Sequence, residues 1–165
     1  MNQREQAAPS LDLVFNEVKE RISVQLGQIE ALDHKAGTLL GLSSVVITIA
    51  AGLRFVEGEG ASKVAFLTLF SLGALFYAIT IFFAFRGYWV VEYRRDPEPR
   101  PLRDFYLSQE EELTKRRLLS NMIASYEFNV PLLRNKAYNI RMAARFLFVE
   151  TVLLALALTT ERAIT

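Results

Sequence analysis

Residues 64–85 read VAFLTLFSLGALFYAITIFFAF, a run of 22 residues without a charged side chain. An α-helix rises about 1.5 Å per residue, so this run covers about 33 Å, enough to cross the hydrocarbon core of a bilayer. A water-soluble helix of the same length carries a polar stripe along one side. Here only Thr68, Ser71, Tyr77 and Thr80 interrupt the apolar side chains. The run therefore predicts a transmembrane helix.

A second apolar window precedes it at residues 37–53, where 17 residues carry no charge. By the same geometry this window covers about 26 Å. The stretch EGEG between the two windows marks a short turn. We therefore predict a transmembrane hairpin over residues 37–91, with spans at about 37–55 and 64–86.

A third apolar window, residues 146–160, contains one acidic side chain, Glu150. We predict a third transmembrane helix over residues 143–160. The alternative is an amphipathic helix that lies on the membrane surface. Residues 151–160 are apolar on all sides, whereas a surface helix needs a strongly polar face.

Two further segments, residues 1–36 and 108–142, are amphipathic. Their apolar side chains recur at alternating spacings of three and four, which is typical of an α-helix packed along one face. These side chains are Leu11, Phe15, Val18, Ile22, Ile29 and Leu32, and then Leu119, Ile123, Tyr126, Val130, Leu133, Ala137 and Ile140. We expect one long helix from about Leu11 into the first span. A second should run from about Gln109 into the third span, with Ser108 as its N-cap.

Between the hairpin and the second amphipathic helix lies a proline-rich segment, which predicts an extended linker over residues 92–107. The two amphipathic helices are expected to pack on each other outside the membrane. The sequence thus predicts an all-α membrane protein with three transmembrane helices and a cytoplasmic helical stalk.

The distribution of lysine and arginine predicts the orientation. Four lie in residues 1–36, two in the turn after the first window, twelve in residues 86–145 and one in the C-terminal tail. Cytoplasmic segments retain positive charge. The N-terminus and the middle segment should therefore be cytoplasmic, and the hairpin turn and the C-terminus should lie outside.

Signatures of enzymes and cofactor sites are missing from the sequence. It has no cysteine and one histidine, which excludes disulfides, thiol catalysis and histidine-rich metal sites. It contains no phosphate-binding glycine loop, no GxSxG and no HExxH. The net charge of +1 gives no general attraction for nucleic acid. We expect no catalytic residue, no metal, no cofactor and no nucleic-acid partner.

Glu150 is the first candidate functional residue, because an acidic side chain inside a span is costly. We predict an intramembrane pair between Glu150 and Arg86, at the inner end of the second window. Two interpretations stay open. The acid is either structural, paired or reaching toward the headgroups, or it lines or gates a pore in an oligomer.

Gly37 and Gly41 form a GxxxG pair in the first window, and Ser44 and Thr48 continue roughly the same side. Faces of small residues allow helices to approach closely in lipid. This helix-packing face either contacts the second span or joins copies in a homo-oligomer.

Polar residues gather where the two long helices are expected to reach the membrane. Asp33 and Lys35 lie on the first helix, and Asn129 and Lys136 lie seven residues apart on the second. We predict that these four form a polar cluster at the interface; the alternative is a set of ordinary flanking residues. His34 either senses pH or is a solvated interface residue.

The stretches LDHKAGTLLGLSSVVITIAAG and EFNVPLLRNKAYNIRMAARFLFVETVLLALAL together resemble the small membrane effectors of bacterial Pycsar antiphage defence, and related effectors of cyclic-nucleotide defence systems. In that family a helix with Asp-x-Lys-Ala enters the first span, and a later helix with Asn and Lys-Ala enters a further one. The matching residues are Asp33, Lys35, Ala36, Asn129, Lys136 and Ala137.

The resemblance implies a cyclic nucleotide signal from a partner cyclase, followed by oligomerisation and loss of membrane integrity. The chain contains no recognisable cyclic-nucleotide-binding domain. We expect a non-enzymatic effector of antiphage defence in the bacterial cytoplasmic (inner) membrane, with the lipid bilayer and further copies of itself as partners. The phosphate of a bound nucleotide would meet Arg94, Arg95, Arg134 and Lys136. The alternative function is a small scaffold or accessory subunit of a larger membrane complex.

Overall fold

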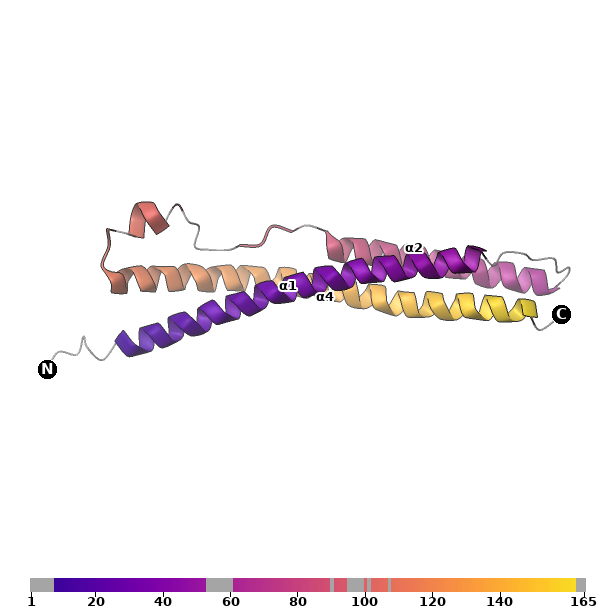
Figure 1. Cartoon of the computed structure of the whole chain (residues 1–165), viewed down its shortest axis with the longest axis horizontal. Helices are drawn as coiled ribbons and strands as arrows, with labels where there is room; N and C mark the ends of the chain where they lie inside the picture. Colours follow the sequence, from indigo (N-terminus) through magenta and orange to yellow (C-terminus); the bar gives the residue numbers. More distant parts are fainter. Residues whose placement is uncertain are drawn as a thin grey trace. The chain divides into compact units, whose positions relative to one another are not determined.

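The computed structural model describes residues 8–52, 61–89, 91–94, 100, 102–106 and 108–162. These residues form α1 (Ala8–Gly52), α2 (Ala61–Tyr88), the short π-helix η1 (Leu102–Tyr106) and α4 (Glu111–Arg162), as Figure 1 shows. No strand occurs in these ranges. The helices α1, α2 and α4 are each long and apolar enough to cross a membrane. The predicted all-α membrane protein with three such helices is confirmed.

Both long helices join an amphipathic segment to an apolar one without a break. α1 begins at Ala8, three residues before the predicted start, and Pro9 is tolerated there because the N–H groups of a first helical turn have no partner within the helix. α4 continues through Pro131. The proline-rich stretch at residues 95–99, predicted as linker, lies outside the described residues.

The predicted N-cap of α4 is wrong. Gln109 donates its backbone N–H to the Tyr106 carbonyl at 3.1 Å, and the helix begins only at Glu111. Glu111 and Glu112 occupy the first turn of α4, where acidic side chains interact favourably with the positive end of the helix dipole.

The chain packs as two units, and α1 and α4 contribute to both. The first, here called the two-helix unit, comprises residues 1–30 and 90–134. The second, the three-helix unit, comprises residues 31–89 and 135–165 and contains all of α2.

In the two-helix unit α1 and α4 run parallel. Asp12 of α1 pairs with Lys115 of α4 at 2.9 Å, and Gln25 contacts Asn129 further along both helices. The Lys115 ammonium also pairs with the Glu111 carboxylate at 2.7 Å. The hydrogen bonds that Lys115 donates to Glu111 and to Asp12 raise its pKa above the usual range, so this ammonium stays charged at physiological pH.

In the three-helix unit α2 runs antiparallel to α4, and two glycines bring the helices close. A Cβ atom on Gly73 would lie 2.6 Å from Cδ2 of Leu154, and one on Gly87 would lie 2.8 Å from Cγ1 of Ile140. Gly87 lies 14 residues after Gly73 on α2, and its contact Ile140 lies 14 residues before Leu154 on α4, so the two helices run in opposite directions. The ring of Phe146 packs against α2 between these two contacts.

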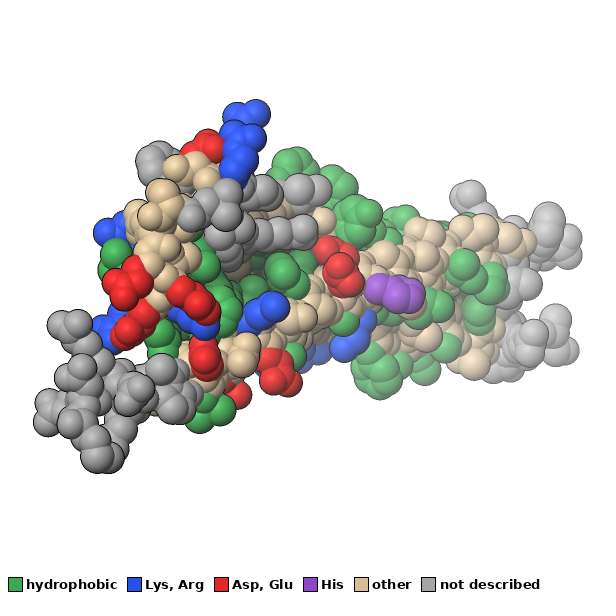
Figure 2. Space-filling view, turned by 60° about the vertical axis from the view of Figure 1, so that its left-hand side comes forward, with side chains coloured by type: hydrophobic (Ala, Val, Ile, Leu, Met, Phe, Trp, Pro, Cys, Tyr) green, Lys and Arg blue, Asp and Glu red, His purple; other side chains and the backbone are tan. Residues whose placement is uncertain are grey.

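The surface of the three-helix unit is apolar, whereas its interior contains polar groups. Phe148 is 71% exposed and Phe82 57% exposed, while Ser43, Thr80 and Glu150 are fully buried. In Figure 2 the described side chains to the right of the purple histidine are hydrophobic or uncharged. Water-soluble proteins show the opposite distribution, so this surface is suited to lipid.

Candidate functional site

The polar side chains buried among the described residues lie on the inner faces of the long helices. They are Gln25, Ser43, Thr80, Ser125, Asn129, Lys136, Asn139 and Glu150. Within the three-helix unit, Lys136 and Glu150 contact α1, and they belong to a series of buried α4 residues at intervals of seven, Lys136, Ala143, Glu150 and Ala157. A seven-residue period is the packing repeat of a coiled coil. The candidate functional residues therefore occupy positions that decide how the helices pack.

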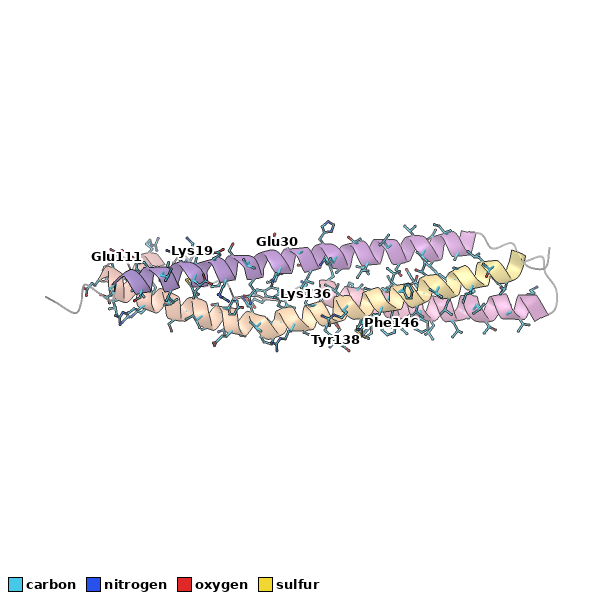
Figure 3. The ribbon with its side chains drawn as sticks, turned by 90° about the horizontal axis from the view of Figure 1, so that it is seen from below. Lys19, Glu30, Glu111, Lys136, Tyr138 and Phe146 are labelled. Carbon is cyan, nitrogen blue, oxygen red and sulfur yellow. The ribbon has the colours of Figure 1, made fainter. Side chains whose placement is uncertain are left out.

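Lys136 forms the first polar contact of the three-helix unit. Its ammonium pairs with the carboxylate of Asp33 on α1 at 2.5 Å. The side chain of Lys136 is 5% exposed and that of Asp33 is 37% exposed. Figure 3 shows Lys136 on the side of α4 that faces α1, and Tyr138 on the side that faces away. The pair joins two predicted cluster residues and fixes the register of α1 against α4.

Glu150 forms the second contact, deeper in the same unit. The hydroxyl of Ser43 on α1 donates to both carboxyl oxygens of Glu150, at 2.8 and 3.1 Å. The hydroxyl of Thr80 on α2 lies beside the same carboxyl and itself donates to the Phe76 carbonyl at 2.9 Å. A single acidic side chain therefore meets residues of both neighbouring helices.

Arg86 is not the partner of Glu150. Gly87 packs against Ile140 and α2 runs antiparallel to α4, so Arg86 lies level with residue 141, nine residues before Glu150. Nine helical residues correspond to about 14 Å along the axis, more than the two side chains can bridge. Arg86 is exposed at the end of α2 instead.

Asn129 is the centre of a separate contact in the two-helix unit. Its side-chain oxygen accepts a hydrogen bond from the backbone N–H of Arg94 at 3.0 Å, and its amide donates to the Arg94 carbonyl at 2.9 Å. The same amide donates to Gln25 of α1 at 3.4 Å, and Gln25 donates to the Tyr126 carbonyl at 3.3 Å. Asn129 thus joins α1, α4 and the segment 91–94 that follows α2.

The four residues predicted as an interface cluster are divided between the two units. Asp33 and Lys136 pair in the three-helix unit, where Lys35 is exposed, and Asn129 belongs to the two-helix unit.

The predicted ligand-binding cations have different surroundings. Arg94 is exposed, and its guanidinium lies 4.3 Å from the centre of the Phe128 ring, a cation–π contact. Arg134 is exposed on α4. Lys136 is buried and paired with Asp33, and Arg95 lies outside the described residues.

Among the residues that the structure describes, no side chain packs closely against the predicted helix-packing glycines. A Cβ atom on Gly37 or Gly41 would meet nothing within 4 Å. Gly37 lines a shallow open groove together with Asp33, His34, Thr38 and Tyr88. The hydroxyl of Thr38 donates to the backbone carbonyl of His34 at 3.0 Å. The glycines that bring helices together are Gly73 and Gly87.

Sequence reasoning missed several of the residues in these contacts. Gln25, Ser43 and Thr80 are small or neutral polar residues, which give no electrostatic signal. Their spacing could have indicated that they are buried. Gln25 continues the series Leu11 and Val18 at intervals of seven, and Ser43 falls seven residues after the buried Ala36.

The arrangement provides hydrogen bonds and ion pairs between helices. No group of acidic or histidine side chains suited to a metal ion occurs within the described ranges. The pairs Asp33–Lys136, Ser43–Glu150 and Gln25–Asn129 join side chains of α1 and α4, so a change in register would separate them at a cost of desolvation.

Comparison with protein-family models matches residues 17–161 to the Pycsar effector protein domain. The chain belongs to this family. Neither the curated proteins nor the solved structures that were compared include a match. Among the residues that carried the resemblance, Asp33 and Lys136 form the ion pair, Asn129 contacts the Arg94 main chain, and Ala36 is fully buried.

Proposed function

We propose that this protein is a non-enzymatic effector of antiphage defence that impairs membrane integrity when a cyclic nucleotide is present. The match to the Pycsar effector protein domain over residues 17–161 carries the proposal. Three helices able to cross a membrane support it, because such an effector acts within the bilayer.

The buried polar contacts support a gated rather than a permanently open state. Ser43, Thr80 and Glu150 are fully buried, so the three-helix unit as described presents an apolar surface to lipid. A closed unit of this kind is harmless to the membrane, and a signal must rearrange it before ions pass.

We further propose that the protein lies in the bacterial cytoplasmic membrane with a cytoplasmic N-terminus, and that the active form is a homo-oligomer. The two-helix unit would then meet a nucleotide made in the cytoplasm. Arg94 and Arg134 are exposed cations suited to its phosphate. Lys136 would contribute only after leaving Asp33, because its ammonium is buried in that pair.

Reconstitution tests this function. The purified protein is inserted into vesicles that hold a potassium-sensitive dye, and a panel of cyclic mononucleotides is added. We expect one of them to release potassium, while the corresponding linear monophosphates do not. A substitution of both exposed cations, Arg94→Gln with Arg134→Gln, should raise the nucleotide concentration needed for release.

The alternative function, a scaffold or accessory subunit, predicts another result. A scaffold would leave the vesicles intact with every nucleotide, and its expression together with an active cyclase would leave the membrane potential of cells unchanged. Potassium release that is equal with and without nucleotide would contradict the proposed gating.

A further inference from the structure

The three apolar windows together contain one charged residue. Residues 37–53 and 64–85 contain none, and residues 146–160 contain Glu150 alone. Any path for ions through these windows therefore meets at most one kind of fixed charge from this chain, a carboxylate. Fixed carboxylates attract cations and repel anions in membrane pores.

Glu150 does not face lipid in the described structure. It is fully buried, with the Ser43 hydroxyl on both of its oxygens and Thr80 beside it. The hydroxyls on the outer surface differ, because they are satisfied within their own helices. Ser44 donates to the Leu40 carbonyl at 2.8 Å, and Thr151 donates to the Leu147 carbonyl at 2.8 Å.

Among the side chains that the structure describes in the three-helix unit, no unpaired cation lies on the buried face. Arg86, Arg141 and Arg145 are exposed. Asp33 and Lys136 neutralise each other at one end of this face. Lys63 and Lys35 are exposed near the ends of α2 and of the apolar part of α1.

We propose that the active protein conducts cations selectively, along the face of α4 that is packed against Ser43 in the closed state, and that Glu150 selects them. This inference rests on the proposed membrane-permeabilising function and adds the class of permeant ion, monovalent cations such as potassium and sodium. Separation of α1 from α4 admits water to the buried face. A hydrated glutamate is ionised at neutral pH, so the path then contains a ring or line of carboxylates from the assembled copies.

The first test measures ion selectivity in a planar bilayer with a potassium chloride gradient and the activating nucleotide. We expect the wild-type reversal potential to lie close to the potassium equilibrium potential. Glu150→Gln keeps the size of the side chain and an acceptor for Ser43 but removes the charge, so its reversal potential should shift close to zero. Glu150→Asp and the matched neighbour Thr151→Val should keep the wild-type value.

A second test uses the absence of cysteine, because a single introduced thiol is then the only one in the chain. Ser43→Cys places it on the buried face, and Ser44→Cys places it one residue away on the outer face. A water-soluble cationic thiol reagent should reduce the current of Ser43→Cys only after nucleotide is added. It should leave Ser44→Cys unchanged.

The outcomes separate this inference from the function on which it rests. A wild-type current without cation preference, or an unchanged reversal potential in Glu150→Gln, overturns the inference and leaves permeabilisation standing. If Glu150→Gln fails to insert, reaction at Ser44→Cys but not at Ser43→Cys overturns it equally. The absence of any nucleotide-dependent current in the wild-type protein would overturn both.

Discussion

At the scale of single residues, the ion pair of Asp33 and Lys136 is asymmetric. Lys136 is nearly completely buried, whereas Asp33 keeps more than a third of its side chain exposed. Water can therefore solvate Asp33 when its partner is removed, but it cannot solvate Lys136 equally well. Removal of one member of a buried pair is strongly destabilising when the remaining charge stays buried.

We therefore predict that Asp33→Asn destabilises the protein by about 3 kcal/mol, and that Lys136→Met costs less than half as much. The double variant should be more stable than Asp33→Asn alone, because no buried charge remains. The fluorescence of Trp89, the only tryptophan, reports unfolding when SDS is titrated into detergent micelles. The exposed Lys35→Met is the control and should have no effect. Equal losses for the two single variants would contradict this asymmetry.

The sequence predicted which polar side chains make contacts between helices better than it predicted the partners of those contacts. The sequence placed Asp33 and Lys136 in one polar cluster, and they are in contact. It also singled out Glu150, but it assigned Arg86 as the partner in place of Ser43. Partner choice depends on the register between helices, and charge gives no information about a serine.

At the scale of helices, the approach of α2 to α4 depends on two glycines. Gly73 and Gly87 lack the Cβ atoms that would collide with Leu154 and Ile140. The GxxxG pair Gly37 and Gly41 on α1 was predicted to pack against another helix, but a Cβ atom at either position would meet no described atom within 4 Å. The helical period was evident along each segment, but the sequence gives no measure of which face another helix covers.

Gly73→Val should destabilise the three-helix unit by roughly 2 kcal/mol, because the added methyl groups overpack the contact with Leu154. Gly41→Val, which meets open space, is the matched control and should leave the stability of the monomer unchanged. Both are measured by the same SDS titration. If Gly41→Val were the more destabilising variant, the packing of α2 on α4 would have to be different. A loss of nucleotide-dependent current in Gly41→Val without loss of stability would indicate contact between copies.

At the scale of the whole molecule, three helices in the described part of the chain have the length and composition needed to cross a membrane. An odd number of crossings predicts that the two ends of the chain lie on opposite sides. The fold class was predictable because the apolar windows are long and nearly free of charge. The helix ends were predicted less accurately: α4 starts two residues later than expected, and the Gln109 N–H bonds to the Tyr106 carbonyl before it.

Reporter fusions test the orientation predicted from the lysine and arginine distribution. A fluorescent protein placed before Met1 should fluoresce in the cytoplasm, and alkaline phosphatase placed after Thr165 should be active outside. Phosphatase fused after Arg100 is the control and should be inactive. An inactive phosphatase at the C-terminus, in a protein that still enters the membrane, would mean that α4 does not cross.

The contact made by Asn129 has a consequence for how this sequence can diverge. Asn129 holds Arg94 through main-chain atoms alone, the N–H and the carbonyl. Any amino acid other than proline presents the same two groups. The contact with Asn129 therefore survives an exchange of the side chain at position 94, which could acquire new chemistry for a new signal, while position 129 must keep its carboxamide.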